Sequence, residues 1–272
     1  MFINIFIEKG KEMKNIIFLS DIHANFEALQ QITNLPEYHD PNTEFWFGGD
    51  YSDGFDLKPK ATINTWNFIM SLCQSGKAKA ILGNHDEFIL DAAYQPDKYT
   101  WWEHNGREDT LDNLELSFTN PHELREQLLY HYYNQMEWLK SLPLSLETEH
   151  LLMIHAGVDL DVALNQQSKD TLLWIREPYI YAEQNLNLED IHYDFKGKTL
   201  ISGHSPTVYI DHYELDPCPI VTKKSIGLTR YFIDGGSKSG PNIQGRINLL
   251  KLDEFGNEIW KKYATQDGIF NY

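Results

Sequence analysis

The feature that most constrains the fold of this chain is a short apolar segment that stops abruptly at glycine or a polar side chain. Such segments are typical of buried strands. Six occur, at 16–19, 45–47, 80–82, 151–154, 200–201 and 231–233. The polar residues that follow them are Asp21 and His23, Asp50 and Asp53, Asn84, His85 and Asp86, His155, His204, and Asp234. The pattern predicts a sheet with polar turns at its strand ends.

Helical patterns lie between these segments. One covers 26–35 after Asn25, a residue type favoured at helix N-caps, and the pattern at 123–139 predicts one long helix. Strands that alternate with helices predict an α/β sheet. Apolar segments at 247–252 and 258–263, on either side of a turn, predict a β-hairpin near the C-terminus.

Five of the six strand ends carry groups that can bind a metal ion or transfer a proton. In open α/β sheets ligands bind at the carboxyl ends of strands, so these groups should gather along one edge. Carboxylate, imidazole and amide ligands without a thiolate suit manganese, iron, zinc or cobalt better than a structural zinc site. Each motif alone has a structural interpretation, such as a turn at Asp21 or Asn84 and a core histidine at His155. Their joint occurrence indicates metal binding.

Composition narrows the class of protein. The 272 residues carry a formal net charge of −17, and such a surface repels nucleic acid and anionic membranes. The longest apolar runs fall far short of the roughly 20 residues of a membrane-spanning helix. The N-terminus lacks the pattern of a secretion signal, and the two cysteines, Cys73 and Cys218, are expected to be reduced. We therefore expect a cytoplasmic protein that binds neither nucleic acid nor membranes.

Taken in chain order, the motifs resemble those of the calcineurin-like metallophosphoesterases. They are Asp21-Ile22-His23, Gly49-Asp50-x-x-Asp53, Gly83-Asn84-His85-Asp86, His155-Ala156-Gly157 and Gly203-His204. The resemblance implies an α/β fold, a four-layer αββα sandwich of two mixed β-sheets flanked by helices. It also implies a single domain over 14–265 with a helical spacer at about 95–143. Residues 1–12 would then be an N-terminal extension, with Met13 as the true start.

The resemblance implies two metal ions and a ligand set for each. The ligands would be Asp21 and His23 for the first ion, Asp50 as a bridge, and Asn84, His155 and His204 for the second. The ions would be manganese and/or iron, with zinc, cobalt or nickel as alternatives. His85 would stay off the metals and protonate the leaving group, with Asp53 hydrogen-bonded to its ring. The alternative for Asp53 is a turn residue, since Asp53-Gly54 is a common turn pair.

One position favours the phosphoprotein phosphatase branch of this family, which includes bacterial serine/threonine phosphatases and symmetrical diadenosine tetraphosphate hydrolases. Many phosphodiesterase-like members have a second histidine two residues after the Gly-His pair, where this chain has Pro206. The segment Leu173-Trp174-Ile175-Arg176-Glu177 is similar to the arginine segment of the branch. Arg176 is therefore the predicted phosphate clamp, together with Asn84 and His85.

The chain departs from the branch at a second phosphate-binding arginine. Gly54 stands where the branch has that arginine, directly after Asp53. Arg107 stands where the branch usually has a glycine, and it is a candidate replacement from another loop. The missing arginine affects the prediction of the substrate class more than the prediction of metal binding.

These observations predict a metal-dependent phosphoesterase that hydrolyses phosphomonoesters by attack of a metal-bound hydroxide. A serine/threonine protein phosphatase is favoured because Asp53 is retained, and its substrate would be a phosphorylated protein or a small phosphorylated molecule. The alternative is a symmetrical dinucleoside tetraphosphate hydrolase, since Tyr99, Trp101 and Trp102 could stack on adenine, although a hydrophobic cap is the favoured interpretation of these residues. A small-molecule phosphodiesterase and a non-catalytic metal-binding scaffold are less favoured, and the oligomeric state is left open.

Overall fold

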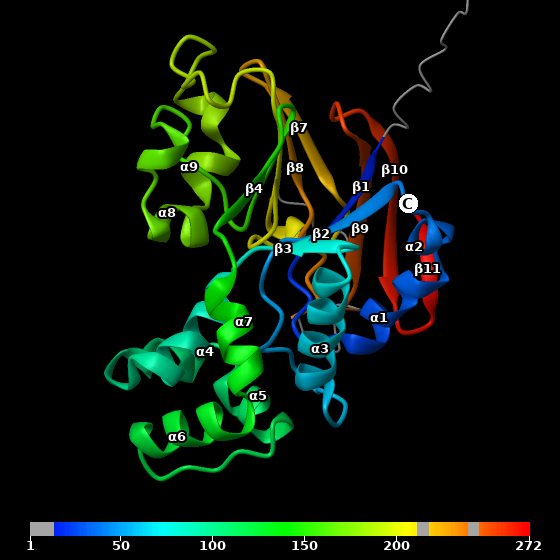
Figure 1. The fold of residues 1–272 in the computed structure, drawn as a ribbon. Helices are drawn as coiled ribbons and strands as arrows, with labels where there is room; N and C mark the ends of the chain where they lie inside the picture. Colours follow the sequence, from blue (N-terminus) through cyan, green and yellow to red (C-terminus); the bar gives the residue numbers. More distant parts are fainter. Residues whose placement is uncertain (1–13, 211–217, 239–244) are drawn as a thin grey trace, which may run out of the picture.

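Two mixed β-sheets pack face to face between layers of helices in the computed structural model, which describes residues 14–210, 218–238 and 245–272 (Figure 1). The predicted fold class is confirmed, while the predicted extension at 1–12 lies outside the described residues. The strand order of the first sheet is β11 (Gly268–Asn271), β10 (Glu258–Thr265), β9 (Ile247–Asp253), β1 (Asn15–Leu19), β2 (Thr43–Phe47) and β3 (Ala78–Ala80). The strand order of the second sheet is β4 (Ser145–Glu147), β5 (Leu151–Ile154), β6 (Thr199–Ser202), β8 (Leu228–Phe232) and β7 (Val221–Ser225).

Successive side chains of the central strands point into different layers of the core. In β1, Ile16 and Phe18 pack between the two sheets. Ile17 and Leu19 face the helices that cover the first sheet. Because both faces of these strands are buried, their sequences are apolar without a polar interruption.

Helices cover the outer faces of the sheets (Figure 1). The first sheet is covered by α1 (Phe26–Gln30) and α3 (Ala61–Gln74), and α2 (Pro36–His39) precedes β2. The second sheet is covered by α8 (Lys169–Trp174) and α9 (Glu177–Ile180). After α4 (Asn84–Tyr94), the predicted spacer contains the 3-10 helix η2 (Pro96–His104), α5 (Arg107–Asn113), α6 (Pro121–His131) and α7 (Tyr133–Ser141). Short 3-10 turns occur at Gln31–Asn34, Leu164–Gln166, Ala182–Gln184 and Thr207–Tyr209.

The prediction of one helix over 123–139 is wrong, because the segment forms α6 and α7 with a break at Tyr132. The backbone of Tyr132 leaves helical geometry (φ −128°), and its hydroxyl donates a 2.7 Å hydrogen bond to the carbonyl oxygen of Leu114. Leu128 and Met136, on the two sides of the break, are both fully buried. The predicted hairpin is present as β9 and β10, and β11 adds a strand that the sequence did not predict.

The parallel strands of both sheets end at one edge, which positions the predicted site. In the first sheet β1, β2 and β3 are parallel neighbours, and in the second β5, β6 and β8 are. Main-chain hydrogen bonds join the loops that leave them. The N–H of Asp21 donates to the oxygen of Gly49 at 3.1 Å, and that of Gly203 donates to the oxygen of His155 at 2.8 Å.

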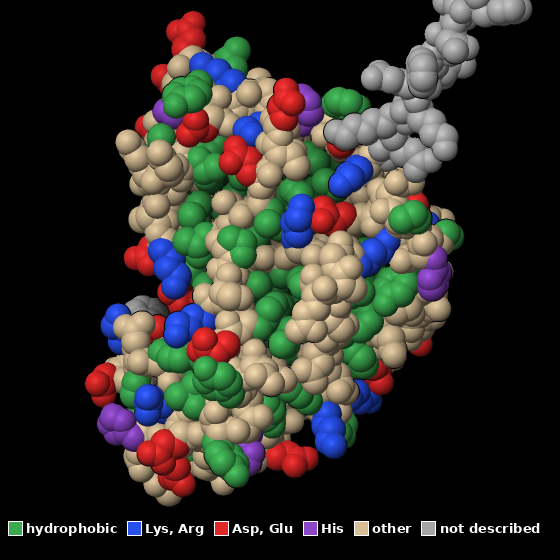
Figure 2. Space-filling model, in the orientation of Figure 1, with side chains coloured by type: hydrophobic (Ala, Val, Ile, Leu, Met, Phe, Trp, Pro, Cys, Tyr) green, Lys and Arg blue, Asp and Glu red, His purple; other side chains and the backbone are tan. Residues whose placement is uncertain are grey.

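The molecular surface does not separate its charges on the face shown in Figure 2, where basic side chains lie scattered among acidic ones. Cys73 and Cys218 are not joined in a disulfide in the part of the chain that the structure describes. Within the described ranges, no helix combines the length and the apolar character that crossing a membrane requires.

Candidate metal centre

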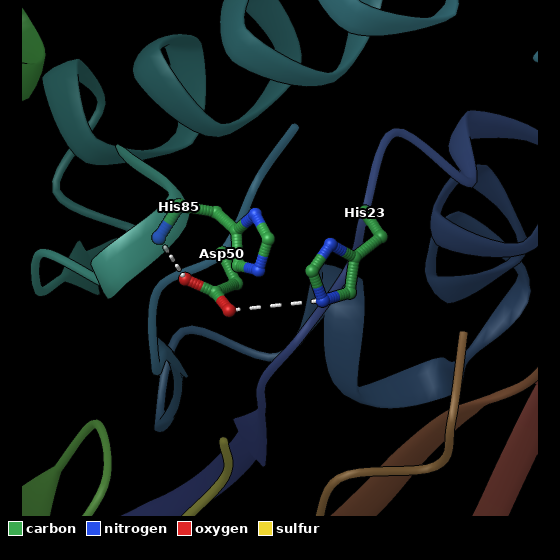
Figure 3. Close-up of side chains that lie close together, drawn as sticks. All are labelled: His23, Asp50 and His85. Carbon is green, nitrogen blue, oxygen red and sulfur yellow. Dashed lines mark hydrogen bonds and ion pairs between the residues drawn. The ribbon is translucent and has the colours of Figure 1, made fainter. Parts of the chain in front are cut away.

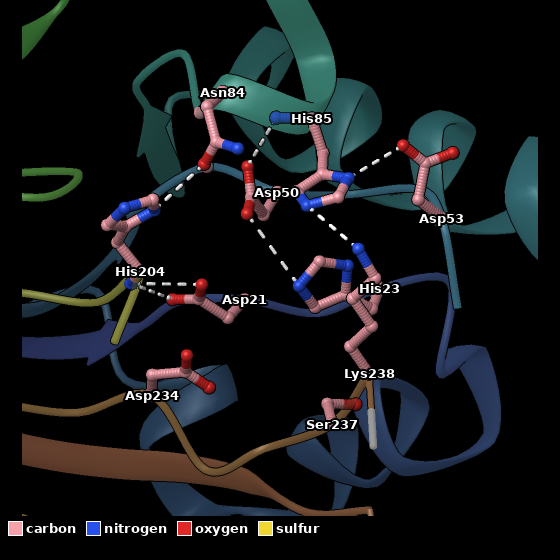
Figure 4. A network of polar contacts seen from close by, with 12 residues as sticks. Asp21, His23, Asp50, Asp53, Asn84, His85, His204, Asp234, Ser237 and Lys238 are labelled. Atoms are coloured by element: carbon pink, nitrogen blue, oxygen red, sulfur yellow. Dashed lines mark hydrogen bonds and ion pairs between the residues drawn. The ribbon is translucent and has the colours of Figure 1, made fainter. Parts of the chain in front are cut away.

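The polar residues of the strand ends converge in one buried cluster (Figure 4). The loops after β1, β2, β5 and β6 contribute to it, together with the first turn of α4. No member is more than 6% exposed: Asp21, His23, Asp50, Asn84, His85, His155 and His204. The sheet topology thus brings together residues as far apart in sequence as Asp21 and His204.

Five residues of the cluster and its surroundings have a left-handed backbone. The φ angles are 54° at Asp21, 47° at His23, 58° at Asp50, 65° at Asp53 and 63° at His204. Non-glycine residues rarely adopt this conformation, which costs on the order of 1–3 kcal/mol each. The sharp turn directs each side chain from its strand end toward the cluster. Strained residues of this kind gather at functional sites, which makes this edge the candidate site.

Main-chain carbonyl groups hold two of the histidines in defined tautomers. The Nδ1 of His23 lies 2.8 Å from the oxygen of Ser52, and the Nδ1 of His155 lies 2.8 Å from the oxygen of Gly48. Because a carbonyl oxygen only accepts hydrogen bonds, each Nδ1 carries a hydrogen, and the Nε2 of the neutral ring presents a lone pair. Burial holds the pKa of His23 well below its usual value, which keeps this ring neutral.

The carboxylate of Asp50 lies between these two lone pairs. Its Oδ2 is 3.7 Å from the Nε2 of His23 (Figure 3), and its Oδ1 is 3.5 Å from the Nε2 of His155. The Oδ1 also accepts a 2.9 Å hydrogen bond from the main-chain N–H of His85. A carboxylate that turns one oxygen toward each of two imidazole lone pairs is suited to bridge two cations.

Asn84 completes a second group of ligand atoms. Its Oδ1 lies 2.8 Å from the Nε2 of His155 and 2.9 Å from the Nδ1 of His204. Since the hydrogen of His155 is on Nδ1, its Nε2 and the amide oxygen are two acceptors at close range, an arrangement that a cation would stabilise. The Nε2 of His204 is buried and has no hydrogen-bond partner among the described residues. This group therefore fits a metal ion.

Buried carboxylates give the cluster an excess of negative charge. Burial raises the pKa of Asp21, Asp50 and Asp234, and repulsion from Asp21 raises the pKa of the other two further. Bound cations would offset this repulsion. Ligand atoms of His23, Asp50 and His85 lie within 4.8 Å of one another, and so do those of Asp50, His155 and His204. The two groups share Asp50, so the cluster fits a binuclear centre with nitrogen and oxygen ligands.

Asp21 lies beside these two groups and faces the backbone of the loop after β6. Its two oxygens accept the main-chain N–H of His204 at 3.0 and 2.9 Å. Gly203 is required at this point, because a Cβ there would collide with the carboxylate of Asp21. Each oxygen keeps a further lone pair, so the contact does not prevent Asp21 from binding a metal ion.

His85 belongs to the first group by distance, but both nitrogens of its ring have other partners. Its Nδ1 lies 2.7 Å from the Oδ2 of Asp53, and its Nε2 lies 3.0 Å from the Nζ of Lys238 (Figure 4). An ammonium group only donates, so Nε2 accepts and Nδ1 donates to Asp53. A metal ion on Nε2 would have to displace the Lys238 cation, which supports a role for His85 away from the metals.

Asp53 is held by donors from the helical spacer. The indole N–H of Trp102 donates to both of its oxygens at 2.9 Å, and the hydroxyl of Thr110 donates to Oδ1 at 2.6 Å. Gly106, with a φ of 102°, permits this approach, because a Cβ there would lie 2.8 Å from the Cβ of Asp53. Burial raises the pKa of Asp53 to about 7, and the hydrogen bonds from Thr110 and Trp102 act in the opposite direction.

The sequence did not predict Trp102 and Thr110 as partners of Asp53. Trp102 is fully buried in the core around the first sheet, so the interpretation of its ring as an adenine platform is wrong. The side chains of Tyr99 and Trp101, which belong to the same prediction, lie outside the described part of the structure. Only the predicted helical spacer at about 95–143, which contains both residues, could have drawn attention to these contacts.

Arg176 reaches the cluster from the residue before α9. Its Nη1 donates to the carbonyl oxygen of His204 at 3.1 Å and to the Oγ of Ser205 at 2.9 Å. The guanidinium therefore lies next to the second group of ligand atoms, where a phosphate bound to the centre would be within reach.

Arg107 does not provide a second guanidinium on the side of the cluster opposite Arg176. Its guanidinium donates to Glu103 at 2.8 Å and to Glu108 at 2.9 Å, at the surface of the spacer. Two carboxylates already neutralise this arginine, and this arrangement does not support Arg107 as the replacement for the cation missing at Gly54.

Comparisons with known proteins agree with this geometry. A family model described as calcineurin-like phosphoesterase matches residues 14–208. A symmetrical bis(5'-nucleosyl)-tetraphosphatase of Actinobacillus succinogenes is 27% identical over 153 residues, which are 55% of this chain and 47% of that protein. A protein of the same name from Aeromonas hydrophila is 30% identical over 145 residues, 52% of this chain and 44% of that protein. The chain thus spans about half the length of the curated relatives it matches.

Solved structures show the same fold at low sequence identity. That of a proposed diadenosine tetraphosphatase has a TM-score of 0.56 at 14% identity, and the match covers 94% of this chain and 95% of that chain. A mutant cold-active protein tyrosine phosphatase also has a TM-score of 0.56, at 16% identity, with 94% of this chain and 79% of that chain covered.

Proposed function

Because the chain belongs to the calcineurin-like phosphoesterase family, we propose that it hydrolyses phosphoric esters at a binuclear metal centre in this cluster. The observation that carries the proposal is Asp50, whose two oxygens face the Nε2 lone pairs of two histidines. The six residues proposed to hold the ions are Asp21, His23, Asp50, Asn84, His155 and His204. Manganese and iron suit this nitrogen and oxygen ligand set, which contains no thiolate.

The side chains around the centre would divide the reaction among them. Bound metal ions would supply Lewis acidity and lower the pKa of water. Arg176 and Asn84 would bind the non-bridging oxygens of the phosphate, since a guanidinium offers two donors in one plane. The Nε2 of His85 would lie at the leaving oxygen, and Asp53 would hold the opposite nitrogen of the ring in its protonated tautomer.

The proposal is tested by replacing His85 with asparagine in the metal-loaded protein. Turnover of phosphoserine, whose alkoxide leaving group needs a proton, should fall by roughly 10²–10⁴-fold, the usual contribution of a general acid, while metal content measured by mass spectrometry stays the same. His122→Asn, an exposed position on α6, is the matched control and should leave both quantities unchanged. A loss of metal in His85→Asn would show that His85 is a ligand, and wild-type activity without metal would refute the metal-dependent reaction.

A second candidate is the symmetrical hydrolysis of dinucleoside tetraphosphates, and the names of the curated relatives favour it. In this reaction diadenosine tetraphosphate yields two molecules of ADP. Chromatography of the products separates this outcome from asymmetric cleavage to AMP and ATP. Turnover of a phosphoserine peptide without turnover of the dinucleotide would favour the protein phosphatase instead.

A further inference from the structure

A lysine outside all the sequence motifs reaches the centre from the loop after β8. The Nζ of Lys238 lies 3.0 Å from the Nε2 of His85 and 3.1 Å from the carbonyl oxygen of Asn105 (Figure 4). These two acceptors use two of its three N–H groups. Among the residues that the structure describes, none forms an ion pair with Lys238 within 4.0 Å. One N–H group of this cation is therefore available beside the ring of the proposed general acid.

The structure explains why a cation from this loop is needed. A Cβ at Gly54 would collide with the main-chain oxygen of His23, so the loop after β2 has no room for the arginine of the phosphatase branch. Arg107 is bound by two glutamates. Arg176 lies on the side of His204, which leaves Lys238 as the cation next to His85 among the described residues.

We infer that Lys238 binds the leaving group of the substrate and favours one that carries negative charge, as the departing phosphate of a phosphoanhydride does. The inference rests on the proposed function, because it takes the Nε2 of His85 as the position of the leaving oxygen. Lys238 is thus a specificity-determining residue for the same site.

The chemistry of the leaving group explains the preference. Water adds to phosphorus, the bond from phosphorus to the leaving oxygen breaks, and the electron pair stays on that oxygen. A serine or threonine alkoxide must then take up a proton, which His85 would provide from Nε2 once its ring is doubly protonated, with Asp53 as the counterion. A departing phosphate is stable as an anion, and a fixed ammonium group beside it stabilises the charge that develops as the bond breaks.

The space beside this position can hold a leaving group larger than phosphate. A cavity of about 580 Å³ begins at His23 and is lined by Asn25, Phe26, Phe55 and Ser237, the last being the neighbour of Lys238 in the chain. This volume is within the range of small-molecule sites, and the cavity offers both aromatic rings and an amide. Glu27, Asp56 and Asp267 also line the cavity, so the negative charge of a leaving group would be met by Lys238 rather than by the cavity wall.

A purely structural role for Lys238 makes a different prediction. The carboxylates of Asp53, Asp50 and Asp234 act on Lys238 over longer distances. If the lysine only balanced these charges, its removal would weaken metal binding or folding and would slow all substrates alike.

The test compares Lys238→Met with the wild-type full chain, each loaded with manganese and checked for metal content and Tm. The kcat/KM for diadenosine tetraphosphate should fall by roughly 10–100-fold, the usual effect of losing a hydrogen bond to a charged group, while that for phosphoserine, whose leaving group takes up a proton and departs neutral, changes less than about threefold. Lys238→Arg should restore most of the loss. Lys140→Met, an exposed lysine on α7, is the control and should change neither substrate.

Calorimetric titration gives a second readout that needs no turnover. Pyrophosphate should bind Lys238→Met more weakly than the wild type by roughly tenfold, whereas orthophosphate, which has no leaving group, should bind both alike. Equal losses of kcat/KM for the anhydride substrate and the ester substrate in Lys238→Met, or an unchanged affinity of this variant for pyrophosphate, would overturn the inference. If the wild type hydrolysed neither ester nor anhydride, the proposed function would fail, and the titration would still decide the role of Lys238.

Discussion

Asp50 and Asp53 are two buried carboxylates on one loop, yet their surroundings differ. Asp50 accepts one main-chain N–H from His85 and turns its oxygens toward two imidazole lone pairs. Asp53 accepts an indole N–H and a hydroxyl hydrogen and lies 2.7 Å from a ring nitrogen of His85. The first carboxylate has a single donor among the described residues and suits cations, whereas the second is surrounded by donors and suits the positioning of the His85 ring. The two carboxylates are therefore suited to different tasks.

The largest effect that this comparison predicts is at Asp50. Asp50→Asn removes the charge that both cation positions share, so metal content should fall at both and turnover should drop by on the order of 10³-fold or more. Mass spectrometry under native conditions counts the ions that remain bound. Asp91→Asn, at a half-buried position on α4, is the control, and full retention of both ions by Asp50→Asn would refute the bridging role.

Asp53→Asn should separate catalysis from metal binding. The amide can no longer accept the N–H of His85 as a charged partner, and loss of such a supporting contact costs roughly 10–100-fold in activity. Metal content should not change. Steady-state kinetics should place the loss in kcat rather than in KM, and a parallel loss of metal would contradict the division between the two carboxylates.

A smaller effect is expected at Trp102, because only one donor of Asp53 is removed. Trp102→Phe keeps an aromatic ring in the core and should lower kcat by roughly tenfold. Trp138→Phe is a matched control, since the indole nitrogen of Trp138 is buried without a hydrogen-bond partner among the described residues. Similar kcat values for the two variants would show that the Trp102 N–H does not support Asp53.

The smallest effect on chemistry is expected at Asp86, which supports the loop of Asp50 rather than the reaction. Its oxygens accept main-chain N–H groups of Asp50, Tyr51 and Gly83 at 2.9, 3.0 and 2.9 Å. An asparagine offers one acceptor oxygen in place of two, so Asp86→Asn should lose about 1–3 kcal/mol of unfolding free energy. Urea denaturation measures this loss, and activity should persist below the melting transition. Unchanged stability would show that the three contacts are dispensable.

The convergence of the candidate metal ligands could be predicted from the sequence, because strand geometry places the ends of parallel strands together. Parallel strands must end at the same edge, so any side chain in the first turn after β1, β2, β5 or β6 faces its counterparts. The residue types Asp21, His23, Asp50 and His155 together then favour metal binding. The two-sheet fold and the family were predicted from the resemblance of the motifs to the calcineurin-like metallophosphoesterases, and both were confirmed.

The surroundings of Asp53 and His85 depend on packing between distant segments, which no local sequence pattern records. Trp102 meets Asp53 across 49 residues, and Lys238 meets His85 across 153. The same long-range packing buries Trp102, which the sequence alone presented as a candidate for stacking. It also pairs Arg107 with neighbouring glutamates instead of the phosphate. The sequence by itself determined which groups gather at the candidate metal centre, because backbone geometry orders strand ends. Only the tertiary structure decided which groups surround the ring of His85, because those contacts depend on how the spacer and the last loop pack against the sheets.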